Sequence, residues 1–219
     1  MPDSSFERAA KRLGYEIVAG VDEVGRGPWA GPVYAAAAII DTRKIAAKGL
    51  SGLDDSKKLN AAQREVLFER LQECATIGIG WCEVGEIDRI NILQASLLAM
   101  KRAIASLPIQ PHYVLVDGNK APDLACPCQT IIKGDARSYS IAAASIVAKV
   151  TRDRLMVKLA QSHPGYGWHT NMGYGTKEHQ AGLARHGVTV HHRKTWAPIF
   201  NRLSQLSLDL RDVASGDSP

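Results

Sequence analysis

The sequence has no run of about 18 apolar residues, the length that a membrane-spanning helix needs, so we expect no membrane contact. Its first residues also lack the basic segment and apolar core of a secretory signal, and we therefore expect a cytoplasmic protein. Cysteine is scarce: the four residues are Cys74, Cys82, Cys126 and Cys128. In a leaderless chain we expect free thiols, and Cys126 and Cys128 stand too close together for a structural zinc site.

Internal repeats are also absent, and 219 residues suit one large domain or one domain with a small appendage. We expect one domain over residues 1–203 and a polar, flexible tail over 204–219. The net charge of +5 favours a polyanionic partner. Basic residues gather in the stretches 149–158 and 185–202, each of which could serve a nucleic acid or form a solvated face.

Hydrophobic periodicity indicates an α/β protein. Strand-like runs span 16–22, 32–41, 75–83, 113–117 and 128–133, and helix-like runs span 5–13, 60–74, 86–106, 139–161, 176–186 and 196–208. Asn60 and Gln63 have the spacing of a capping box at the start of the second helix. The order of the elements predicts one mixed five-stranded sheet flanked by helices, with a small helical C-terminal extension.

The most informative stretch, AGVDEVGRGP, runs from Ala19 to Pro28. An apolar strand ends here in two adjacent carboxylates, Asp22 and Glu23, whose burial is costly unless a cation compensates their charge. Hard divalent cations such as Mg²⁺ prefer carboxylate oxygens. Glycines at 25 and 27 allow the backbone of another molecule to approach closely. The stretch therefore indicates a metal site beside a ligand-binding turn.

Two other interpretations of this stretch have to be weighed. A Gly-x-Gly turn after a strand is half of a dinucleotide-binding fingerprint, but Pro28 and Pro32 would break the helix that must open at the glycines. Acids at the strand end would also repel a pyrophosphate. The second alternative is a solvated turn with two surface acids and an arginine, and this stretch alone does not exclude it.

Two further strands lead to an aspartate. The run Tyr113–Val116 closes on Asp117, and the run Ile131–Gly134 precedes Asp135. Ligands gather at strand ends in open α/β sheets, and three such ends in one chain are hard to attribute to turn chemistry. Four carboxylates could hold two divalent cations about 3.5–4 Å apart, the arrangement used for phosphodiester cleavage.

The adjacent acids pose a geometric problem. Neighbouring strand residues point to opposite faces of a sheet, so Asp22 and Glu23 cannot both face one metal pair from a regular strand. Either the chain leaves regular β geometry at Glu23, or one acid acts through a water molecule or through the long Glu side chain. The sequence leaves these alternatives open.

An ordered set of motifs covers the chain from about Tyr15 to about Leu203. These are GVDEVGRG from residue 20, DSKKL from 55, VDGN from 116, KGD from 133, AASIVAKVTRD from 143, GYGT from 173 and HRKTW from 192. Together they resemble the bacterial type 2 ribonucleases H, the ribonuclease HII family. The resemblance implies a ribonuclease H-like fold and an endonuclease that cleaves RNA in RNA–DNA hybrids and single ribonucleotides in duplex DNA, leaving 5′-phosphomonoesters.

The resemblance also implies site residues. The metal-binding and catalytic acids, which would use Mg²⁺ or Mn²⁺, fall on Asp22, Glu23, Asp117 and Asp135. The substrate contacts fall on Gly25, Arg26, Gly27, Lys57, Tyr174 and Thr195. In the family, the glycine-arginine-glycine element reads the ribose at the junction and the tyrosine packs on the neighbouring deoxyribose. The lysine and the threonine match positions that contact phosphates.

The chain departs from the family pattern at two places. Asn171 and Met172 stand where the family commonly has His-Lys, which removes a charge near the substrate. Thr195 and Trp196 replace the commoner Ser-Phe and keep a hydroxyl and an apolar ring. None of the four acids is missing, and nothing demands a partner subunit, so we expect an active monomer.

Two other functions compete with this hypothesis. The first is a non-catalytic nucleic-acid-binding module that uses the basic stretches alone, and the second is another nuclease of the same fold, such as a junction resolvase or an exonuclease. The four acids favour an enzyme. The glycine turn favours recognition of a 2′-OH, the group that distinguishes RNA from DNA.

The tail carries one more motif. Gln205–Leu210, QLSLDL, resembles the peptides that dock into the bacterial sliding clamp. Such a peptide could bind a hydrophobic groove and tether the enzyme to DNA. The alternative is that its leucines belong to the end of the last helix and pack on the domain.

Overall fold

The computed structural model describes residues 1–41, 45, 49–50, 52–54, 56 and 58–205. Its elements in chain order are α1 Ser5–Arg12, β1 Val18–Val24, β2 Val33–Ile39, α2 Ala61–Cys74, β3 Thr76–Cys82, α3 Val84–Ala105, β4 Tyr113–Asp117, β5 Cys128–Ile131, η2 Gly134–Ala136, α4 Tyr139–Ser162, α5 Trp168–Asn171 and α6 Lys177–His186. Residues 197–205 form a further helical segment. Among the described residues, no helix combines the length and the apolar character that a membrane crossing needs.

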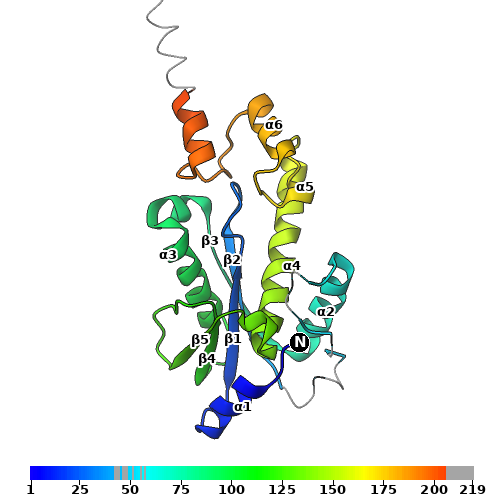
Figure 1. Ribbon diagram of the computed structural model, residues 1–219, viewed down its shortest axis with the longest axis vertical. Helices are drawn as coiled ribbons and strands as arrows, with labels where there is room; N and C mark the ends of the chain where they lie inside the picture. The colour runs from blue at the N-terminus through cyan, green and yellow to red at the C-terminus, as the bar shows by residue number, and fades with distance from the viewer. Residues whose placement is uncertain (42–44, 46–48, 51, 55, 57, 206–219) are drawn as a thin grey trace, which may run out of the picture.

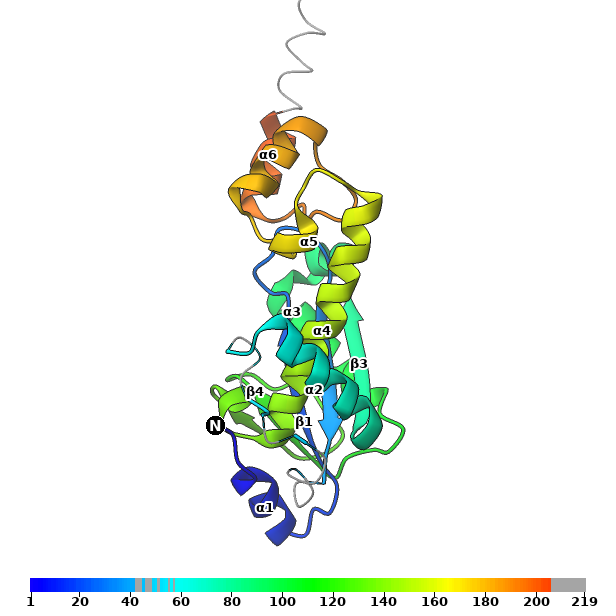
Figure 2. The ribbon, with the colours of Figure 1, turned by 90° about the vertical axis from the view of Figure 1, so that its right-hand side faces the viewer.

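Five strands form one mixed sheet in the order β3-β2-β1-β4-β5. The strands β1, β2 and β3 pair antiparallel, whereas β4 pairs parallel with β1 and β5 pairs parallel with β4. Figure 1 shows α3 and α4 on opposite sides of this sheet, with α5 and α6 beyond one end of it. In the turned view of Figure 2, α2 lies beside α4. The predicted mixed five-stranded sheet flanked by helices is confirmed.

Small side chains bring the helices close to the sheet. On one face, alanines of β1 and β2 pack against Ala95, Ala99 and Ala103 of α3. On the other face, alanines of β2 pack with the alanine-rich first half of α4. Methyl groups on both sides of an interface allow close approach of the backbones and leave few voids. The sheet is therefore held firmly between α3 and α4, and its strand ends have fixed positions.

The closest approach lies at Gly20 of β1. A Cβ atom at this position would lie 2.2 Å from the carbonyl carbon of Ser140 and 2.3 Å from the amide nitrogen of Ile141. Only a glycine leaves room for the first turn of α4 against the strand. Since Gly20 precedes Asp22 by two residues, this contact sets the distance between the acidic strand end and α4.

Several predicted boundaries hold. The capping box at Asn60 is formed, and α2 and α6 cover nearly the predicted ranges. All four cysteines are free thiols, as predicted. The last helix begins at 197 against a predicted 196, and its predicted end at 208 lies outside the described residues. The same is true of residues 206–210 of the clamp-like motif.

Other boundaries differ for physical reasons. The predicted strand 128–133 ends at Ile131, because Lys133 adopts a left-handed conformation (φ 56°) and starts the short helix η2. The helix α5 was not predicted, since four residues between left-handed Gly167 and Met172 are too few to show a helical period. The third predicted helix is interrupted at Asn91 (φ 65°, ψ 165°), whose side chain accepts hydrogen bonds from the amides of Leu93 and Gln94.

The Gly20 contact predicts a stability effect. The Gly20→Ala variant is expected to lose about 1–3 kcal/mol of unfolding free energy, because the added methyl group must displace the backbone of α4. Urea denaturation measures this difference. Gly85→Ala is the matched control: its Cβ would meet nothing within 4 Å, so the free energy of unfolding should stay equal or rise slightly. Equal stability of the Gly20→Ala variant and the wild type would contradict the prediction.

Candidate active site

Three neighbouring strands bring the four predicted acids to one end of the sheet. The strands β1, β4 and β5 are parallel, so their carboxyl ends share one edge. The pairing of β1 with β4 runs as far as Val21 and Val116, which places Asp22 and Asp117 next on adjacent strands. Asp135 lies in η2, just after β5. The acids are thus gathered by topology from segments far apart in the sequence.

The strand β1 stays regular through both of its acids. It remains paired with β2 as far as Val24, so the chain does not leave β geometry at Glu23. Asp22 is opposite Ala36, which packs toward α4, whereas Glu23 is opposite Ala35, which packs toward α3. The two acids therefore occupy opposite faces of the sheet.

The short strand β4 lets Glu23 reach the other acids. Because β4 ends at Asp117 while β1 continues to Val24, no β4 backbone flanks Glu23. Glu23 and Asp117 both line a cavity of about 60 Å³, together with Arg26 and side chains of α3. Of the alternatives left open by the sequence, this arrangement favours the long Glu side chain, which extends past the end of β4.

The four acids share one electrostatic environment. Asp22 and Asp135 are 6% and 5% exposed. Burial raises the pKa of Asp22 well above its usual range, and the charges of Glu23, Asp117 and Asp135 raise it further. Burial also raises the pKa of Glu23, and this rise is opposed by Arg26, whose Nη1 lies 3.3 Å from Glu23 Oε1. A divalent cation would relieve this repulsion.

Backbone amides orient three of the carboxylates. Asp117 Oδ1 accepts a hydrogen bond from the Gly134 amide at 2.6 Å, which links β4 to the turn that carries Asp135. Asp22 Oδ1 accepts from the Glu23 amide at 2.7 Å, and Asp135 Oδ1 accepts from the Ala136 amide at 2.9 Å. These bonds fix the carboxylates before any ligand arrives.

The turn with Asp135 is also anchored by the N-terminal helix. Glu7 of α1 is 2% exposed, and its Oε1 accepts hydrogen bonds from the Ser138 hydroxyl (2.7 Å), the Ser140 amide (2.9 Å) and the Ser140 hydroxyl (2.7 Å). These donors form the first turn of α4, where a carboxylate is stabilised by the helix dipole. No pattern in the sequence indicated this contact, since its partners are more than 130 residues apart.

The donor set fits a hard divalent cation. Four carboxylates stand at one edge, and two of them are buried. The half-exposed Arg26 contacts one of the other two, Glu23. In the described part of the chain, no group of three or more His, Cys, Asp or Glu side chains is arranged to hold one ion by itself. Mg²⁺ does not need such a cage, because it keeps several water ligands and also binds substrate phosphates.

Two of the predicted substrate-contact segments lie together. Gly25 has a φ of +92°, which favours glycine, and the turn continues through the exposed residues Arg26 and Gly27. A Cβ on Gly27 would lie 3.3 Å from Cε1 of Tyr174, whose side chain is 48% exposed. The glycine turn and the tyrosine thus form one exposed surface next to Glu23.

The other two predicted contacts have different outcomes. Thr195 donates its hydroxyl to Asp88 Oδ1 at 2.7 Å, and its amide donates to the same oxygen at 3.1 Å. Its hydroxyl proton is therefore engaged with α3, and a phosphate would have to compete with Asp88. Asp88 was not singled out in the sequence, because it meets Thr195 only across 107 residues. Lys57 lies outside the described residues.

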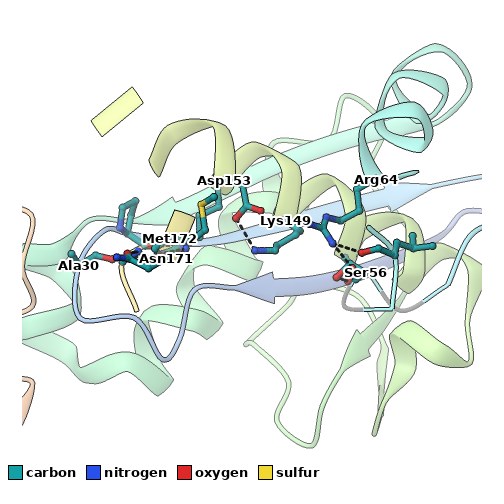
Figure 3. A network of polar contacts seen from close by, with 12 residues as sticks. Ala30, Ser56, Arg64, Lys149, Asp153, Asn171 and Met172 are labelled. Carbon is teal, nitrogen blue, oxygen red and sulfur yellow. Dashed lines mark hydrogen bonds and ion pairs between the residues drawn. The ribbon is translucent and has the colours of Figure 1, made fainter. Parts of the chain in front are cut away.

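The hypothesis that both basic stretches face a polyanion or solvent is wrong for three of their residues, Arg152, His192 and Arg193, which are buried. Arg152 is 1% exposed and Arg193 is 0% exposed, and both donate to backbone carbonyls. Lys149 binds its helix neighbour Asp153 at 2.8 Å, a contact drawn in Figure 3. A cluster of basic residues in the sequence does not indicate which side chains are buried, so the sequence could not distinguish these two arginines from the exposed basic residues around them.

The charge on Asp22 predicts a trade-off between stability and function. In EDTA at neutral pH, the Asp22→Asn variant is expected to melt a few degrees above the wild type, because it removes a carboxyl group whose ionised form is disfavoured by burial and by three neighbouring acids. The raised pKa means that the folded protein holds this proton more tightly than the unfolded chain, so the stability of the wild type falls as the pH rises.

The gain should therefore shrink as the pH is lowered toward 3.8, the usual pKa of an aspartate. Differential scanning calorimetry measures both melting temperatures. Asp123→Asn is the surface control, since the Asp123 side chain is 96% exposed, and should not change the melting temperature. A lower melting temperature of Asp22→Asn at neutral pH would contradict this explanation.

Known proteins resemble this chain over nearly its whole length. Residues 19–204 match the family model of Ribonuclease HII. The ribonuclease HII of Jannaschia sp. (strain CCS1) is 54% identical over 199 residues, which are 90% of this chain and 96% of that protein. Ribonuclease H2 from Pyrococcus horikoshii OT3 has a TM-score of 0.73 at 30% identity, covering 87% of this chain and 99% of its own.

The fold also matches a more distant structure. Bst-RNase HIII in complex with Mn²⁺ has a TM-score of 0.69 at 22% identity, covering 90% of this chain and 72% of its own, a likeness of fold alone. These matches confirm the predicted ribonuclease H-like fold. On its sequence, this chain belongs to the ribonuclease HII family.

Proposed function

We propose that this chain uses its four acids, Asp22, Glu23, Asp117 and Asp135, to hydrolyse RNA strands in RNA–DNA hybrids and to cleave at single ribonucleotides in duplex DNA. Its family makes it a ribonuclease H, and that activity depends on divalent metal ions. The observation that carries the proposal for this chain is the meeting of four acids with the exposed glycine turn at one sheet edge.

The proposed cofactor is Mg²⁺ or Mn²⁺, held by these four acids. When bound, such cations acidify an attacking water and stabilise the leaving 3′ oxygen. The buried carboxylates Asp22 and Asp135 give the site its negative charge in a medium where electrostatic attraction is strong. Glu23 and Asp117 line the open side, where the phosphate of a substrate would arrive. Because the bond between the phosphorus and the 3′ oxygen is broken, hydrolysis leaves a 5′-phosphate and a 3′-hydroxyl.

Recognition of the sugar is assigned to the turn Gly25–Gly27 and to Tyr174. Backbone amides at a glycine turn can approach a ribose closely and hydrogen-bond to its 2′-OH. A deoxyribose would leave such groups unpaired, at a cost of about 1–3 kcal/mol each. The ring of Tyr174, beside Gly27, is placed to pack on the next sugar. Specificity would then come from the sugar, with little preference for base sequence.

Partners and compartment follow from the same proposal. Thr195 and Lys57 are proposed phosphate contacts, and the chain is proposed to act as a monomer in the cytoplasm, where its four free thiols are stable.

The motif Gln205–Leu210 is proposed to bind a sliding clamp. A pull-down with purified clamp tests this: the Gln205→Ala, Leu208→Ala double variant should lose binding, and its retention would refute the proposal.

The Asp117→Asn variant provides the main test of the proposed reaction. It is expected to lose cleavage of a duplex with one ribonucleotide, because a neutral amide no longer attracts the cations, while its affinity for the duplex stays near that of the wild type. Gel-based cleavage and fluorescence anisotropy measure the two quantities, with Asp123→Asn as the active control.

Substrate and metal controls complete the test. The wild type should be inactive in EDTA and should leave an all-DNA duplex of the same sequence intact. Rapid nicking of the all-DNA duplex would favour a different nuclease of this fold. Wild-type activity of Asp117→Asn would remove the acids from the mechanism.

A further inference from the structure

The loop that carries the glycine turn is held by two buried arginines. Arg152 comes from α4, and Arg193 comes from the segment after α6, 41 positions later in the numbering. Arg152 donates from Nη2 to the Ala30 carbonyl at 3.3 Å and from Nη1 to the Met172 carbonyl at 3.1 Å. Figure 3 shows Ala30 beside Met172 at this junction. A third bond joins its Nε to the Pro32 carbonyl at 3.0 Å.

Arg193 binds the glycine turn and also the part of the loop that Arg152 holds. Its Nη1 donates to the Arg26 carbonyl at 2.7 Å, and its Nη2 donates to the Gly25 carbonyl at 2.5 Å. Its Nε and Nη2 also donate to the Gly31 carbonyl at 3.0 and 2.9 Å. One planar guanidinium thus joins the glycine turn to the far side of its own loop.

Neither arginine has an acidic contact among the described residues, since all their hydrogen-bond acceptors are neutral carbonyls. Burial lowers the pKa of Arg193 to about 9 and that of Arg152 to about 10, and the charge of Arg152 adds to the lowering at Arg193. Both groups stay protonated at neutral pH. Asp88 near Arg193 and Asp153 near Arg152 act on these charges only from a distance and offset part of the effect of burial. Two buried positive charges whose hydrogen-bond acceptors are all neutral are costly, and such costs are typical of functional sites.

The bonds of Arg193 act on particular amides. The Gly25 carbonyl belongs to the same peptide unit as the Arg26 amide, and the Arg26 carbonyl belongs to that of the Gly27 amide. A charged donor on a carbonyl polarises its peptide unit and makes the amide at the other end a stronger donor. Within the described residues, the Arg26 and Gly27 amides donate no hydrogen bond to the protein. They are therefore available to a ligand.

We propose that Arg193 is a positioning residue for ribose recognition: through the Gly25 and Arg26 carbonyls it orients and polarises the Arg26 and Gly27 amides toward the 2′-OH of the substrate. This inference rests on the proposed function and extends it. Arg193 itself is buried and does not touch the substrate. Arg193 therefore affects mainly the preference for ribose over deoxyribose, and it affects the overall affinity for a duplex less.

Arg152 provides the matched comparison. It is the same residue type and equally buried, and its guanidinium also packs against Gly25, where a Cβ atom would lie 2.2 Å from the arginine Nε. Its hydrogen bonds, however, go to the carbonyls of Ala30, Pro32 and Met172, and none of these belongs to the peptide unit of the Arg26 or Gly27 amide. Lysine at either position keeps a positive charge and loses the planar fork with its several donors. Comparing the two lysine variants separates an effect on the Arg26 and Gly27 amides from a general loosening of the loop.

The experiment measures, in EDTA, the affinity of each variant for a duplex with one ribonucleotide and for the same duplex in all-DNA form. In the wild type, the ribonucleotide duplex should bind more tightly than the all-DNA duplex. Arg193→Lys is expected to lower this preference about tenfold, which corresponds to the loss of one buried hydrogen bond. Arg152→Lys should keep the wild-type ratio, although thermal melting shows a comparable loss of stability. An unchanged ratio in Arg193→Lys, or an equal fall in both variants, would overturn the proposal.

A measurement on the wild type keeps the test independent of folding of the variants. The amide protons of Arg26 and Gly27 should exchange rapidly with solvent in the free protein, as followed by NMR. Adding the ribonucleotide duplex in EDTA should protect both amides, and adding the all-DNA duplex should not. Equal exchange with both duplexes would overturn the proposal.

Failure of the proposed function gives a different result. If the wild type with Mg²⁺ does not cleave the ribonucleotide duplex, the assignment of the four acids is wrong. If the wild type cleaves it while Arg193→Lys keeps full discrimination, the acids stand and only the role of Arg193 is refuted.

Discussion

Repulsion among carboxylates at one sheet edge is the constraint on which the rest of this structure depends. Asp22 is buried beside three other acids, and both burial and their charges raise its pKa. Close packing elsewhere in the fold offsets this repulsion. The alanine-rich interfaces on both faces of the sheet and the contact at Gly20 hold the strand ends in place. Without such support, repulsion would drive the acids apart into solvent.

Opposite charges are separated along one short segment. The acids Asp22 and Glu23 end β1, and within a few residues the chain enters a loop held by Arg152 and Arg193. The negative end has the oxygen ligands that hard metal ions prefer, and the positive end holds the turn whose amides are proposed to bind the substrate. The turn at residues 25–27 lies at the boundary between the two, where a phosphate and a ribose of one nucleotide could be bound together.

The sequence allowed the meeting of the acids at one sheet edge to be predicted, but not the burial of the two arginines, and the reason is physical. Asp22, Asp117 and Asp135 follow apolar runs, and the rule that parallel strands end at one edge brings them together without further information. The burial of Arg152 and Arg193 depends on carbonyls far away in the chain, which no local pattern encodes. The partnership of Asp88 with Thr195 was missed for the same reason.

The N-terminal helix α1 precedes the part of the chain that the family model matches, yet Glu7 reaches the first turn of α4 and thereby the loop of Asp135. Asp3 adds two backbone bonds to the same turn, at Arg137 and Tyr139. The folded unit therefore begins before the first residue that the family model matches. A change at Glu7 or Asp3 would therefore act on the turn of Asp135 through these hydrogen bonds.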